Sequence, residues 1–122
     1  MNNSRYKFRV WDSTTKKMVN ENLSSSPSSG AILPSWEILK LYSENIMQFT
    51  GLYDKNGKEI YEGDIIKYGF WLEVVEFKDG AFRLFPSKLL LGRLNVYKNC
   101  VVIGDKYKNE ELLKKIKKRI KI

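Results

Sequence analysis

The fold is decided by residues 71–85, which read WLEVVEFKDGAFRLF. Trp71–Lys78 and Ala81–Phe85 are rich in β-branched and aromatic residues, and Asp79-Gly80 stands between them. A two-residue Asp-Gly segment between two such runs is a strong signal for a β-hairpin. We therefore expect two antiparallel strands joined by a tight turn.

Further strands are expected on both sides of this hairpin. They are Ile46–Thr50, Ile65–Tyr68 and Cys100–Ile103. A tight turn is predicted at residues 54–58, because Asn56-Gly57 tolerates the positive φ angles of a two-residue hairpin turn. Short strands at spacings of about ten residues, joined by turns that contain glycine, favour a small bent sheet or a partly open barrel.

The N-terminal segment alternates in polarity. Tyr6, Phe8 and Val10 share one face of an extended chain, so a half-buried strand is expected at residues 5–11, with Met18-Val19 returning as its hairpin partner. Residues 20–35 are rich in serine and are interpreted as a flexible loop within the domain. Residues 35–45 fit either a short helix or a strand, and the helix is slightly favoured.

The C-terminus changes to a helical period. Leu112, Leu113, Ile116 and Ile120 fall on one face, which predicts an amphipathic helix over residues 109–121 with Asn109 as its N-cap. The fold class is therefore α+β and dominated by β-structure: a bent sheet with an N-terminal hairpin and a C-terminal helix. A length of 122 residues, with 43% hydrophobic residues, predicts a single domain over residues 1–122.

The composition limits the compartment and the partners. The one cysteine, Cys100, has no partner for an intrachain disulfide, and the apolar runs are far shorter than the roughly 20 residues that cross a bilayer, so a cytoplasmic protein is expected. The net charge of +8 is concentrated in residues 112–122, which carry six basic residues and no acid. Any attraction to phosphate is therefore expected to come mainly from this basic helix.

Three blocks of sequence carry a family resemblance. Residues 50–68 read TGLYDKNGKEIYEGDIIKY, residues 7–12 read KFRVWD, and Val102-Ile103-Gly104 follows later in the chain. In this order, the blocks resemble the YopX family of phage and prophage proteins. The chain departs from the family at Asp105 and at residues 109–112, where the family has Asn and a Pro-Glu-Leu, and the basic extension from Lys114 is not carried over from the family.

The resemblance implies a small β-rich protein with an added helix, located inside an infected or lysogenic bacterium and self-associating. It implies no catalytic residue, because no activity is assigned to the family as a whole.

Candidate catalytic and metal-binding residues are few. The acidic residues Asp54, Glu59, Glu62 and Asp64 do not have the spacing of a calcium loop, and they are interpreted mainly as turn residues, with a carboxylate pair for acid–base chemistry as the alternative. With no histidine, a single cysteine and no Gly-rich phosphate loop, the sequence predicts no catalytic site, no metal site and no cofactor.

Candidate binding residues fall into two groups. The aromatic residues that could stack on bases are Trp11, Trp36, Tyr68, Phe70 and Trp71, although aromatic residues on strands more often belong to the core. The segment Tyr68-Gly69-Phe70-Trp71 is singled out because it lies at an expected turn. The basic residues of the helix are Lys114, Lys115, Lys117, Lys118, Arg119 and Lys121.

The basic helix has three interpretations. It binds nucleic acid, it contacts an acidic protein, or it docks its apolar face on the sheet while its lysines stay solvated, which is the commonest outcome for such a charge run. The favoured function is a phage or prophage accessory protein that acts by binding as a homo-oligomer, with a host or phage protein as a further partner. The alternatives are a nucleic-acid-binding protein that uses the helix and Trp71, and a small enzyme that uses Glu59, Glu62 and Asp64.

Overall fold

The computed structural model describes residues 7–19 and 45–119. The chain divides into two compact units, Met1–Phe49 and Thr50–Ile122, and each is described by itself. The prediction of one domain over residues 1–122 stays a prediction. The predicted loop at 20–35 and the helix or strand at 35–45 lie outside the described residues, apart from residue 45.

The first unit contains the predicted N-terminal hairpin. β1 (Phe8–Asp12) pairs antiparallel with β2 (Lys17–Val19), and on its other side with the start of β3 (Ile46–Tyr53). The turn between β1 and β2 is held by Asp12, whose Oδ1 accepts hydrogen bonds from the backbone N–H groups of Thr14 at 2.9 Å and Thr15 at 3.2 Å. The short polar side chain of Asp12 therefore acts as the turn former.

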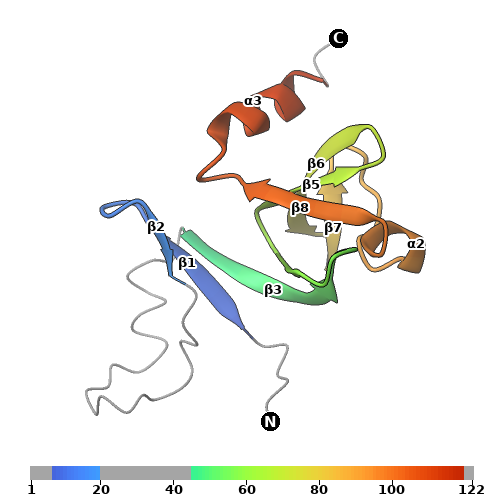
Figure 1. Ribbon diagram of the computed structural model, residues 1–122, viewed down its shortest axis with the longest axis horizontal. Helices are drawn as coiled ribbons and strands as arrows, with labels where there is room; N and C mark the ends of the chain where they lie inside the picture. Colours follow the sequence, from blue (N-terminus) through green and yellow to red (C-terminus); the bar gives the residue numbers. More distant parts are fainter. Residues whose placement is uncertain (1–6, 20–44, 120–122) are drawn as a thin grey trace. The chain divides into compact units, whose positions relative to one another are not determined.

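The second unit is built on a four-stranded antiparallel sheet with the order β7-β6-β5-β8 (Figure 1). Its strands are β5 (Asp64–Tyr68), β6 (Trp71–Lys78), β7 (Ala81–Phe85) and β8 (Cys100–Asp105). The end of β3 lies beside β4 (Glu59–Tyr61). The curled sheet confirms the predicted β-dominated fold with a bent sheet.

The two predicted tight turns have different outcomes. Asp79 and Gly80 both have positive φ, 53° and 79°, which confirms a two-residue hairpin turn between β6 and β7. The tight turn predicted at residues 54–58 is also present, but Asn56-Gly57 is not a two-residue turn, because Gly57 has a φ of 83° whereas Asn56 does not have a positive φ. Residues 55–57 form a longer loop, in which the Gly57 N–H donates to the carbonyl of Asp54 at 3.0 Å.

The curled sheet has two apolar faces. One face closes the main core, where the buried side chains are Ile60, Ile66, Val75, Leu84, Leu91, Val96, Cys100 and Val102. The short helix α2 (Leu94–Tyr97), which the sequence analysis did not predict, contributes Val96 to this core. The other face carries Ile65 and Val74, which alternate with the core residues along β5 and β6.

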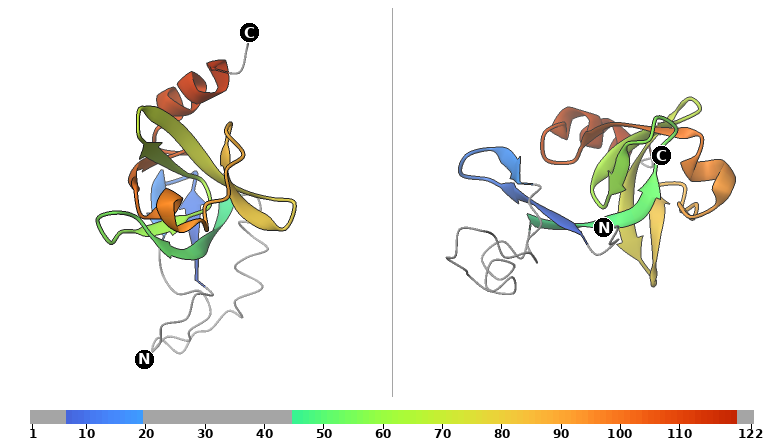
Figure 2. Two further views of the ribbon diagram at one scale, coloured as in Figure 1. Left: turned by 90° about the vertical axis from the view of Figure 1, so that its right-hand side faces the viewer. Right: turned by 60° about the horizontal axis from the view of Figure 1, so that its bottom comes forward.

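The C-terminal helix α3 (Glu110–Lys118) covers this second face (Figure 2). Ile116 is fully buried against Ile65 and Val74, with Leu112 and Leu113 at its sides. The docked interpretation of the helix is thereby confirmed for its apolar face. Asn109 is the N-cap residue as predicted, but its side chain makes no cap hydrogen bond: its Oδ1 accepts from the Asp105 N–H at 3.0 Å.

Among the residues that the structure describes, neither helix is long and apolar enough to cross a membrane.

Candidate binding surface

The turn between β5 and β6 presents two aromatic side chains to solvent. Tyr68 pairs with Trp71, so Gly69 and Phe70 form a two-residue turn, and Gly69 supplies the positive φ of 64° that its first position requires. Phe70 is 98% exposed and Trp71 is 56% exposed. Two adjacent exposed aromatic residues are not explained by packing, so this aromatic tip, residues 69–71, is a candidate interaction site.

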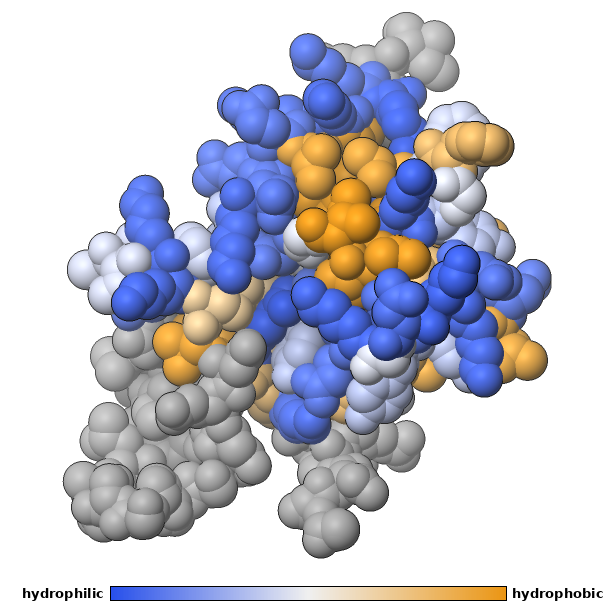
Figure 3. Space-filling model, viewed as in Figure 1, coloured by the Kyte–Doolittle hydropathy of each residue, from blue (hydrophilic) through white to orange (hydrophobic). Residues whose placement is uncertain are grey.

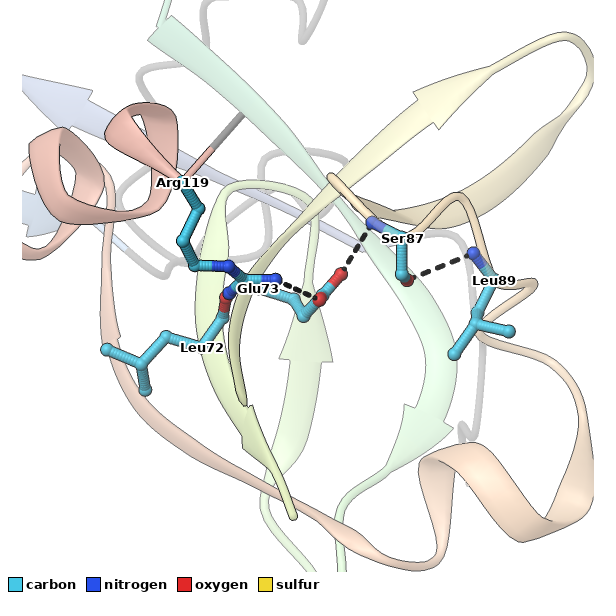
Figure 4. Close-up of polar contacts among 5 residues, drawn as sticks. All are labelled: Leu72, Glu73, Ser87, Leu89 and Arg119. Carbon is cyan, nitrogen blue, oxygen red and sulfur yellow. Dashed lines mark hydrogen bonds and ion pairs between the residues drawn. The ribbon is translucent and has the colours of Figure 1, made fainter. Parts of the chain in front are cut away.

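Arg119 connects the end of α3 to the sheet (Figure 4). One of its Nη atoms donates to the carbonyl of Leu72, and the other lies 3.1 Å from Oε2 of Glu73. The side chain of Glu73 is only 3% exposed, and its Oε1 accepts from the Ser87 N–H at 3.0 Å. Because a buried carboxylate is unfavourable without a partner, Arg119 compensates the charge of Glu73.

The same guanidinium also lies over the aromatic tip. The Cζ atom of Arg119 is 4.7 Å from the centroid of the Trp71 ring, which is cation–π geometry. Arg119 therefore covers one face of an otherwise half-exposed indole and restricts its movement. The aromatic tip and the basic helix thus meet at one residue.

The predicted basic residues of the helix have separate roles. Lys114, Lys115, Lys117 and Lys118 are exposed, Arg119 is engaged with Glu73 and Trp71, and Lys121 lies outside the described residues. Lys115 and Arg119 are four residues apart, so they share one side of the helix. The two acids of the helix, Glu110 and Glu111, are in its first turn, at the end away from Arg119.

The other predicted stacking residues do not join this surface. Trp11 is buried within the first unit, and Tyr68 is half-buried against the main core. Trp36 lies outside the described residues. The structure therefore brings together Phe70 and Trp71 from the predicted aromatic set.

Two of the four predicted acidic residues hold backbone amides. Oδ1 of Asp54 accepts from the N–H groups of Asn56 at 2.8 Å and Lys58 at 2.9 Å, and its Oδ2 accepts from the Val102 N–H at 2.8 Å. Oδ2 of Asp64, which is also buried, accepts from the Tyr61 N–H at 2.7 Å. Glu59 accepts a hydrogen bond from the hydroxyl of Tyr61 at 3.0 Å. These bonds give the acidic residues structural roles in the turns.

A hollow of about 430 Å³ lies beside the turn at 54–58 and α2, and is lined in part by Tyr53, Tyr97 and Lys98. Asp54 also lines it, but the carboxylate of Asp54 is already occupied by three backbone N–H groups. Among the described residues, no group of three or more His, Cys, Asp or Glu side chains is placed to hold a metal ion.

An apolar row crosses the outer face of the sheet beside α3. Val101 is paired with Lys67, and Lys67 with Leu72, so these three side chains lie on the face that carries Ile65 and Val74. Ile103, at the irregularity in the β5–β8 pairing, is 42% exposed. Figure 3 shows an apolar area on this side of the second unit with hydrophilic residues around it. We call Leu72, Val101 and Ile103 the apolar row.

The engagement of Arg119 with Glu73 was not predicted from the sequence, although one signal was present. Glu73 shares the core-facing side of β6 with Val75. A charged residue in that register requires a buried partner. The identity of the partner, 46 positions later, is set by the docking of α3 and not by any local pattern.

The comparisons with known proteins give one family and one similar solved structure. A family model described as "YopX protein" matches residues 7–114. The crystal structure of protein EF1440 from Enterococcus faecalis is similar, with a TM-score of 0.60 and 30% sequence identity, over 88% of this chain and 96% of that one. No curated protein matches the sequence.

Proposed function

Because the chain belongs to the YopX family, we propose that it is a phage- or prophage-encoded accessory protein that acts by binding, as a homo-oligomer in the bacterial cytoplasm. The phage origin and the cytoplasmic location follow from what the family resemblance implies. Binding and self-association are supported by the surface of the second unit.

The observation that carries the proposal is the apolar row. Leu72 and Val101 are half-buried, with the exposed Lys67 between them, and Leu72 packs at the edge of the cluster under α3. Ile103 is 42% exposed on the same outer face of the sheet. An exposed apolar area with a polar rim is typical of an interface. We assign a second copy of this chain to it, because two-fold dimers, in which the same patch of both subunits meets, are the commonest oligomers.

The acidic residues favour binding over catalysis. Asp64 and Glu59, two of the three carboxylates of the enzyme alternative, already accept hydrogen bonds: Asp64 from the Tyr61 N–H in a buried turn, and Glu59 from the Tyr61 hydroxyl. A general acid or base needs its oxygen atoms available to a substrate. A small enzyme that uses Glu59, Glu62 and Asp64 is therefore the less supported alternative.

Sedimentation of the full chain tests the proposal. At micromolar concentration we expect a mass that is a multiple of 14.3 kDa, and we expect Ile103→Lys to reduce it, because burying an unpaired ammonium is unfavourable. Leu94→Lys is the matched control, since Leu94 is 61% exposed on α2, which packs its Val96 into the main core on the other face of the sheet. A wild-type mass of 14.3 kDa, or an equal effect of both variants, would reject the assigned interface.

A further inference from the structure

We propose that the aromatic tip and the last turn of α3 form a binding site for single-stranded nucleic acid, with bases stacked on Phe70 and Trp71 and phosphates bound by Lys115 and Lys118. This inference rests on the proposed binding function and names a class of ligand for it. It uses a surface different from the apolar row.

The stacking half of the site consists of two aromatic rings, one open to solvent and one held by Arg119. Phe70 stands at the turn with 98% of its surface exposed, so it is open to a planar ligand. Trp71 is 56% exposed, and Arg119 lies 4.7 Å from its ring centroid. Because Arg119 is itself held by Leu72 and Glu73, the indole is fixed before any ligand arrives. A fixed ring loses less conformational entropy on binding a base than a mobile one.

The charged half of the site comes from the helix. Arg119 is committed to Glu73, so the phosphate-binding role falls to the exposed lysines of the same turn and the turn before it, Lys118 and Lys115. The last turn of α3 contains basic residues and its acids are confined to the first turn. The positive charge is therefore concentrated next to the aromatic tip, which is the arrangement of stacking platform and cationic groove found in single-strand binding proteins.

Single strands fit this surface better than two other polyanionic partners. In a duplex the base faces are stacked on one another, so exposed rings gain nothing from it. An anionic membrane would require the apolar face of α3, but Leu112, Leu113 and Ile116 pack against the sheet. Stacking combined with phosphate contacts explains both the exposed rings and the neighbouring lysines.

The test measures binding of the full chain to a labelled oligothymidylate about 16 nucleotides long, by fluorescence anisotropy at several salt concentrations. We expect Phe70→Ser to weaken binding about tenfold or more, because one stacking contact is lost. We expect Lys115→Gln with Lys118→Gln to weaken binding and to reduce the slope of log K against log salt by about 1.4, because two phosphate contacts are lost.

Matched control variants distinguish loss of the proposed site from the general effect of removing an aromatic ring or positive charge. Phe77→Ser removes another exposed aromatic, at the far end of β6, and Lys78→Gln with Lys98→Gln removes the same charge elsewhere. Both controls are expected to bind like the wild type.

Several results would overturn the inference. They are no binding at low salt, equal losses in the test and control variants, binding of duplex as tight as that of the single strand, or binding of anionic phospholipid vesicles in its place. None of these results depends on the sedimentation mass. The nucleic-acid site can therefore be rejected while the proposed self-association stands, and self-association can be rejected while the nucleic-acid site stands.

Discussion

Asp54 shows how much one side chain can contribute to this fold. Its two carboxylate oxygens accept three backbone hydrogen bonds, one of them from Val102 in β8, 48 positions away. In addition, the neighbouring Lys55 N–H donates to the carbonyl of Cys100 at 2.9 Å. The turn between β3 and β4 thereby satisfies backbone groups of β8, which is the end strand of the described order β7-β6-β5-β8.

We predict that Asp54→Asn lowers the free energy of unfolding by about 2 kcal/mol, because an amide can present only one acceptor oxygen and leaves a buried N–H unsatisfied. Urea denaturation measures the change. Asp79→Asn is the control, since Asp79 is exposed and asparagine accepts its φ of 53°. An unchanged urea midpoint in Asp54→Asn would show that the carboxylate is dispensable.

Cys100 gives a prediction that depends on pH. Burial, and to a smaller extent the charge of Asp54, raises the pKa of its thiol from 9.0 to about 11. Between these values the unfolded thiol ionises while the folded thiol stays protonated. The stability that this group contributes is therefore fully present below pH 9 and is lost as the pH rises toward 11.

Comparison with Cys100→Ala isolates this effect from the titration of lysines and tyrosines. We expect the unfolding free energy of the wild type to fall relative to that of the variant as pH rises from 9 to 11. Chemical denaturation at a series of pH values measures it. A difference that stays constant over this window would mean that the thiol ionises equally in both states.

At the scale of elements, α3 is held by an apolar stripe and by the ion pair at its end. We predict that Arg119→Gln destabilises the second unit by about 1 to 2 kcal/mol, a value reduced for the partial exposure of Arg119, because the buried Glu73 then keeps only the Ser87 N–H as partner.

The matched control for that prediction is Lys118→Gln, which removes an equal charge one residue earlier from an exposed position. Urea denaturation measures both variants. If both variants lose the same small amount of stability, the specific contact between Arg119 and Glu73 adds nothing to the free energy of unfolding beyond the effect of removing one positive charge.

Strands and helices were predictable from the sequence wherever the local order of residue types carried the signal. Trp71–Lys78 and Ala81–Phe85 are the observed bounds of β6 and β7, because runs of β-branched and aromatic residues around an Asp-Gly turn are local signals. β4 and α2 were missed because three or four residues are too few to show a period. Asn109 is the N-cap of α3 as predicted, but its side chain accepts from the Asp105 N–H and makes no cap hydrogen bond, which local sequence does not reveal.

The candidate site was predictable in part. The aromatic residues of Tyr68–Trp71 stood out because large rings are unusual at a turn, and the lysines of the helix stood out as a charge run without acids. Arg119 looked like one more solvated cation. Its contacts with Glu73 and Trp71 depend on how α3 docks, which is a tertiary property.

For the whole molecule, the two proposed interactions respond to salt in opposite directions. Lys67 lies between Leu72 and Val101 in the apolar row, so two copies repel each other at low salt and screening favours their association. Nucleic-acid binding weakens with salt, because bound phosphates release counterions. The sign of the salt effect therefore identifies which interaction an experiment reports.

Sedimentation velocity of the full chain over a series of salt concentrations tests the central claim, that this YopX protein acts through its exterior by self-association. The claim predicts a mass above 14.3 kDa that increases with salt and falls in Ile103→Lys. A mass of 14.3 kDa at every salt and protein concentration would contradict it.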